Sequence, residues 1–117
     1  MNDLVKKLSK KDHTVVVNRP DRSAKALEER IGLRVVHVLF EETETELGIR
    51  LDAGKCDYRR GDFAKGTGKI HLQGVLTLNG DRVRCVADVE LESMKGTGRL
   101  EPVAEEEYKT ILAQHAP

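Results

Sequence analysis

The stretch "GKIHLQGVLTLNGDRVRCVADVELES", residues 68–93, decides the fold. At its centre, Asn79-Gly80 is the dipeptide that a two-residue type I′ turn prefers, because both central residues of that turn take a positive φ. If the turn pairs Leu78 with Asp81, every later pair of the two antiparallel strands is determined. The sequence therefore predicts a β-hairpin whose register follows from its turn.

In this register the two faces of the hairpin differ in polarity. The polar face places Lys69 opposite Glu90 and His71 opposite Asp88. Opposite charges directly across two strands contribute about 0.2–1 kcal/mol per pair. A slip of one residue would turn these charges into the core, so we expect the register to be strongly fixed. The apolar face consists of Ile70, Leu72, Leu76, Leu78, Val83, Cys85, Ala87, Val89 and Leu91.

Shorter patterns predict the remaining elements. Strands are expected at 13–18, 33–40 and 46–53, with a weaker one at 55–63. A helix is expected from Asp21, as its cap, to Gly32, as its stop, and another from Pro102 onward. Residues 3–10 are expected to form a short helix with Leu4, Val5 and Leu8 inward.

These elements predict a single domain, residues 1–117, of the α+β class. We expect a mostly antiparallel sheet of five to six strands with two to three helices on one face. The alternative is a small, partly closed β-barrel with flanking helices, because that many strands can curl into a barrel.

Composition narrows the function classes. Twenty basic and twenty acidic residues give no net charge, and aromatic residues make up only 3% of the chain, so neither bulk attraction to nucleic acid nor base stacking is indicated. No apolar run reaches the ~18 residues of a membrane span. The first residues lack the apolar stretch of a signal peptide. We therefore expect a cytoplasmic protein with its two cysteines reduced.

A repeated glycine motif is the first candidate for a binding site. "KGTGK" contributes Lys65, Gly66, Gly68 and Lys69, and "KGTGR" contributes Lys95, Gly96, Gly98 and Arg99. The hairpin register places both copies at the end opposite the turn, as neighbouring loops. Backbone N–H groups of such loops can bind an anion, with the basic side chains adding charge. Neither copy matches a phosphate-binding fingerprint, and the alternative is that the glycines only permit tight strand entry and exit.

Other chemistry is indicated more weakly. His71 opposite Asp88 has the arrangement of an oriented general base, but no nucleophile is placed near it, and an ordinary cross-strand pair explains it as well. Cys56 and Cys85 are isolated, and the four histidines are scattered, so no metal site and no cofactor are expected.

Two segments resemble pieces of the PilZ cyclic-dinucleotide receptors. "YRRGD" resembles their arginine motif, and "LESMKG" resembles the motif within their barrel. Membership would imply binding of a cyclic dinucleotide. The chain departs from the pattern because Phe63 and Ala64 occupy the positions of the second arginine. Leu91 also replaces the acid or amide before Ser93, and only about 20 residues follow Gly96. We therefore do not assign the chain to that family.

The sequence favours a non-catalytic intracellular domain that binds a protein partner or associates with itself as a homodimer through sheet edges. The alternative function is an anion-binding or nucleotide-binding domain that uses the paired KGTG segments. A third hypothesis, an enzyme centred on His71 and Asp88, requires a pocket around these two residues.

Overall fold

The computed structural model describes residues 2–18 and 23–115 of the chain. Its elements are α1 (Asp3–Ser9), β1 (His13–Val17), α2 (Ala24–Gly32), β2 (Val35–Phe40), β3 (Thr45–Leu51), β4 (Gly61–Asp62), β5 (Thr67–Leu78), β6 (Asp81–Glu90), β7 (Lys95–Pro102) and α3 (Glu105–Ala113). No helix in the described part of the chain has the length and apolar composition needed to cross a membrane.

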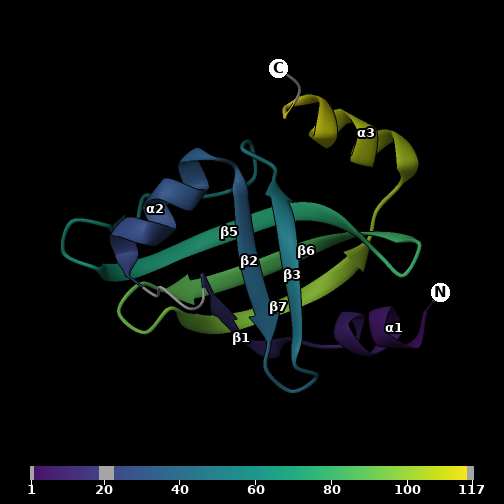
Figure 1. The fold of residues 1–117 in the computed structure, drawn as a ribbon, viewed down its shortest axis with the longest axis horizontal. Coiled ribbons are helices and arrows are strands. Elements are labelled where there is room, and N and C mark those ends of the chain that lie inside the picture. Colours follow the sequence, from purple (N-terminus) through teal and green to yellow (C-terminus); the bar gives the residue numbers. More distant parts are fainter. Residues whose placement is uncertain (1, 19–22, 116–117) are drawn as a thin grey trace.

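The strands form one antiparallel sheet that closes on itself. Their order is β3-β2-β1-β7-β6-β5-β4, and β3 also pairs with β5. In Figure 1, β2 and β3 cross in front of the layer made by β5, β6 and β7. The fold is therefore α+β, as expected, and it takes the barrel form with flanking helices.

The predicted hairpin register is confirmed. Leu78 pairs with Asp81 and His71 pairs with Asp88 across β5 and β6. Asn79 and Gly80 have φ values of 49° and 88°, the positive values that a type I′ turn requires. The apolar face fills the barrel, where it meets the inward side chains of the other strands. Fully buried residues of this core include Val15, Val17, Val36, Val38, Phe40, Ile49, Leu72, Cys85, Val89 and Leu100.

Gly74 explains where the barrel closes. Residue 74 is the one gap in the apolar face of β5, and it pairs with Leu51 at the crossing of β3 and β5. A side chain at this position would place its Cβ 2.7 Å from the carbonyl oxygen of Arg50. The missing side chain lets the two backbones approach closely enough to pair.

The helices cover different parts of the barrel. Val5 and Leu8 of α1 are fully buried, as the sequence predicted, and Leu27 of α2 also joins the core. Ser23 caps helix α2, because its hydroxyl accepts a hydrogen bond from the Ala26 N–H. The expected cap, Asp21, lies outside the described residues. Helix α3 stands on the outer side of the sheet, away from α1 and α2 (Figure 1).

Two expectations for the last third of the chain are wrong. Residues 95–102 form a full strand, β7, between β6 and β1, whereas the second KGTG copy was expected to be a loop. Pro102 ends that strand, and α3 begins only at Glu105 after the cap residue Ala104. Two glycines interrupt any alternation in β7, so its strand character comes from its two neighbours rather than from local propensity.

The expected strand at 55–63 is also much reduced. It consists of one bridge between Asp57 and His71 and the two-residue strand β4. This segment nevertheless lies along the outer edge of β5, because the Lys69 N–H donates to the Arg60 carbonyl.

A buried ion cluster joins α3 to the barrel. The side chain of Arg84 points to the outer face of β6, yet the residue is only 5% exposed. Its guanidinium donates to Asp52 Oδ2 at 3.2 Å, to Gln73 Oε1 at 3.2 Å, and to Glu107 of α3. A buried charge is tolerated when its donors are satisfied in this way.

We predict that Arg84→Ala lowers the free energy of unfolding by about 3 kcal/mol, because it leaves the buried Asp52 carboxylate without its cation. Urea denaturation followed by circular dichroism measures this loss. The control is Arg99→Ala, which removes an arginine whose ion pairs with Asp12 and Glu101 are more exposed. Equal losses for the two variants would contradict the assignment of the Arg84 cluster as a structural link.

Candidate ligand-binding site

The two KGTG copies have different structures. In the first, Gly66 has a φ of 67° in the turn before β5, and Gly68 has a φ of 91° at the start of β5, where it pairs with Gly61 of β4. In the second, Gly96 lies inside the sheet, paired with Val89 of β6 and Val15 of β1. The structure therefore does not contain two matching glycine loops.

Close backbone packing accounts for these glycines. A Cβ on Gly68 would lie 2.0 Å from the Arg60 carbonyl oxygen, and a Cβ on Gly96 would lie 1.8 Å from the Asp88 carbonyl oxygen. Any other residue would force the strands apart at these points. This supports the alternative given above, that the glycines serve the fold.

The two copies do lie at the same end of the hairpin. The Gly68 carbonyl accepts the Leu91 N–H at 2.9 Å, just before β7 begins. Lys69 and Lys95 both stand next to Glu90, one on each side of β6. The two lysines, which were expected to hold an anion together, are thus separated by the Glu90 carboxylate.

The remaining candidates are dispersed. The Lys65 N–H donates to Asp62 Oδ1 in the turn before β5. The Arg99 guanidinium binds Glu101 and Asp12 on the β7 side of the sheet. Gly98 lies within β7, where it pairs with Ala87 and His13.

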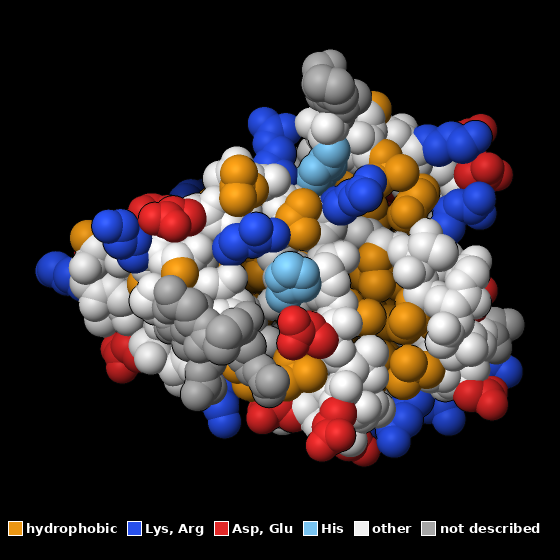
Figure 2. Space-filling model, in the orientation of Figure 1, with side chains coloured by type: hydrophobic (Ala, Val, Ile, Leu, Met, Phe, Trp, Pro, Cys, Tyr) orange, Lys and Arg blue, Asp and Glu red, His pale blue; other side chains and the backbone are white. Residues whose placement is uncertain are grey.

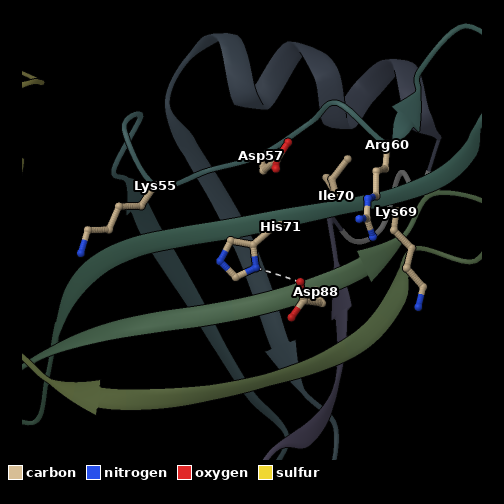
Figure 3. A pocket seen from close by; sticks show the side chains of 7 residues that line it. All are labelled: Lys55, Asp57, Arg60, Lys69, Ile70, His71 and Asp88. Carbon is tan, nitrogen blue, oxygen red and sulfur yellow. Dashed lines mark hydrogen bonds and ion pairs between the residues drawn. The ribbon is translucent and has the colours of Figure 1, made fainter.

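A cavity of about 390 Å³ lies beside this area, on the outer face of β5 and β6. The segment before β4 forms its other wall, held in place by the bridge between Asp57 and His71. Of the residues expected at a KGTG site, only Lys69 contributes to it. The lining consists of Lys55, Asp57, Arg60, Lys69, Ile70, His71 and Asp88 (Figure 3).

His71 is held at the centre of this cavity by two partners. His71 and Asp88 are a pair without mutual backbone hydrogen bonds, the arrangement that brings side chains closest, and Nδ1 lies 2.8 Å from Asp88 Oδ1. Gln73 Oε1 faces Arg84, which can only donate, so the Gln73 amide nitrogen faces His71 Nε2 at 2.8 Å. His71 Nε2 therefore accepts, and Nδ1 carries the proton that is donated to Asp88.

The acidic groups of the cavity already have partners. Asp57 accepts from both Nε and Nη2 of Arg59, and this contact holds the pKa of the Asp57 carboxyl far below its usual value. Asp88 is bound to His71. Both carboxylates are thus engaged by side chains of the protein itself.

The cations of the cavity are less well neutralised. Lys69 lies 4.0 Å from Glu90, at the limit of an ion pair. Within residues 2–18 and 23–115, Lys55 and Arg60 make no ion pair. Figure 3 shows Arg60 and Lys69 side by side at one end of the cavity, with Lys55 at the other end and His71 between them. The cavity therefore carries uncompensated positive charge.

The lining residues include no serine, threonine or cysteine that could act as a nucleophile. Both ring nitrogens of His71 are engaged, so neither is open toward a substrate. Within the described residues, no group of three or more His, Cys, Asp or Glu side chains is placed to hold a metal ion.

Sequence reasoning missed Lys55 and Arg60 as site residues. They come from the segment that was expected to be a weak strand, and its placement against β5 depends on backbone bonds to Lys69 and His71.

The two segments that resemble PilZ motifs do meet, because a Cβ on Gly61 would lie 3.1 Å from Leu91 Cδ1.

No protein-family model matches the chain, and no curated protein is significantly similar to it. The site is therefore defined by its geometry.

We predict that Gly96→Ala lowers the free energy of unfolding by about 3 kcal/mol or more, because the new methyl group overlaps the backbone of Asp88. Chemical denaturation measures the loss. Gly32→Ala is the control, since a Cβ there meets nothing within 4 Å. A Gly96→Ala protein as stable as the parent would show that the glycine is not there for packing.

Proposed function

We propose that the protein is a non-catalytic binding domain and that the cavity beside His71 holds a small ligand with an anionic group such as phosphate. The observation that carries the proposal is the adjacency of Arg60 and Lys69 at one end of the cavity. Two like charges side by side repel each other, and an anion between them removes that repulsion. A guanidinium and an ammonium together provide the charge-assisted donors that phosphate oxygens accept.

The rest of the cavity suggests what the ligand carries besides its anion. A volume of about 390 Å³ falls in the range of small-molecule sites, roughly 300–1,000 Å³. Asp57 and Asp88 offer carboxylate oxygens that can accept from hydroxyl or amino groups. A sugar phosphate or a nucleotide combines both features. This ligand class is the same as in the nucleotide-binding alternative predicted from the sequence. The proposed site is the cavity beside His71 rather than the KGTG glycines.

The proposed ligand class also suits the expected location. Both cysteines are free thiols, Cys85 being fully buried. Free thiols are typical of a reducing compartment, and phosphorylated small molecules are abundant there. We therefore propose that the protein is cytoplasmic.

Binding can be tested with inorganic phosphate, pyrophosphate, a sugar phosphate and mononucleotides, by thermal shift and then by isothermal titration calorimetry. We expect at least one of these to bind, and Arg60→Ala and Lys69→Ala each to weaken it about tenfold or more. This magnitude follows from the roughly 1.5–3 kcal/mol of a charged hydrogen bond. The matched control is Lys109→Ala, on the exposed face of α3 and paired with Glu105, which should bind as the parent does.

Two outcomes would contradict the proposal. One is the absence of binding by every compound in the panel. The other is a ligand whose affinity falls for Lys65→Ala or Lys95→Ala and is unchanged for Arg60→Ala, which would return the site to the KGTG segments.

A further inference from the structure

Strand β3 is paired with β5 over only part of its length. The two strands share the pairs Arg50 with Val75 and Leu51 with Gly74. The part of β3 before Arg50 pairs with β2 on one side and with no strand of the described chain on the other. In Figure 1, β3 and β5 run apart from their crossing point, which leaves this edge uncovered by another strand.

The alternation of the backbone shows which groups are left open. The Leu51 N–H donates to Arg34 O on the β2 side, whereas the Asp52 N–H donates to Gln73 O on the β5 side. Successive residues of a strand point their N–H and C=O groups to opposite sides. The backbone groups of Glu46 and Gly48 therefore point toward the open side.

A groove of about 380 Å³ borders this edge. Its floor includes Leu47 and Leu76, which are 6% and 8% exposed, and Tyr108 of α3 stands at its rim. Figure 2 shows hydrophobic side chains gathered in a band to the right of the position that β3 has in Figure 1. An open strand edge above apolar side chains is a template for the addition of another strand.

We propose that this edge binds β3 of a second copy of the chain, antiparallel to it across a two-fold axis at Leu47. In this register Glu46 lies opposite the partner's Gly48, and the two residues exchange their open N–H and C=O groups. The register centred on Gly48 is excluded, because it needs the backbone of Arg50, which already pairs with Val75. The proposed register uses the open groups of both copies and no group that is already bonded.

The side chains fit the same register. Gly48 has no side chain, so it leaves room for the partner's Glu46 directly across. Glu46 and the partner's Arg50 become diagonal neighbours on one face, at a spacing of about 7–8 Å that long side chains can bridge, while the other diagonal brings the two Glu46 side chains to the same spacing across the two-fold axis. The two-fold axis repeats this pair of opposite charges. This charge pattern, positive and negative on the same short edge, argues for a second copy rather than another extended chain.

The test is sedimentation equilibrium of the full chain over a range of concentrations. We expect a concentration-dependent dimer that Gly48→Pro abolishes. The N–H of Gly48 points away from β2, so the proline removes no hydrogen bond within one copy. Glu46→Arg should raise the dissociation constant about tenfold, since it places like charges together at two symmetric positions. Adding Arg50→Glu to this variant should restore the dimer.

Glu90→Arg, on the outer face of β6, is the matched charge-reversal control and should leave the dimer unchanged. Circular dichroism shows whether each variant is folded. A monomer at every concentration overturns the proposal, and so does a dimer that folded Gly48→Pro retains. Loss of the dimer in Glu46→Arg without rescue by Arg50→Glu also overturns the assigned register. Ligand binding at the His71 cavity plays no part in these outcomes.

Discussion

The turn at Asn79-Gly80 determines which residues of β5 and β6 face each other, and both the barrel and the cavity depend on that register. One face of the hairpin is apolar and fills the barrel. Because the side chains alternate, the same register brings His71 and Asp88 together on the other face. It also places Gly74 where β3 must cross β5. A slip of one residue would remove all three features at once.

The outer face of this hairpin is exposed to solvent at one end and covered by α3 at the other. Hydrogen bonds run without interruption from Asp88 through His71, Gln73 and Arg84 to Glu107 of α3. The donors and acceptors along this chain are fixed by Arg84, which can only donate. The orientation of His71 in the cavity is thus set by a buried arginine beneath α3, a residue that touches no part of the cavity itself.

The sequence was most informative where the interactions are local. The turn dipeptide and the alternation around it predicted the hairpin pair by pair, and the apolar spacing predicted the buried side of α1. Strand β7 was missed because its two glycines carry no strand propensity and it forms only between β6 and β1. Arg84 lies on the polar face by pattern, and it is buried by tertiary contacts with Asp52, Gln73 and Glu107 of α3.

The residues of the candidate site also differ in how far the sequence predicted them. The contact of His71 with Asp88 followed from the register alone, and Lys69 had been named as a site residue only as part of the KGTG motif. Lys55 and Arg60 were not predicted, because their segment has little regular structure and is held against β5 by backbone bonds to His71 and Lys69. The sequence likewise did not reveal that β3 pairs with β5 over only part of its length. The alternation of residues 46–53 is the same whether or not a neighbouring strand is present.

The register is tested most directly by nuclear Overhauser effects between Hα atoms across β5 and β6. In antiparallel sheets the pairs without mutual hydrogen bonds have the closest Cα atoms, about 4.5 Å apart against about 5.5 Å for the others. The register of β5 and β6 requires strong Hα–Hα effects between His71 and Asp88 and between Gln73 and Val86. Effects that instead join His71 to Ala87 or to Val89 would contradict it, and the barrel closure and the cavity would both have to be abandoned.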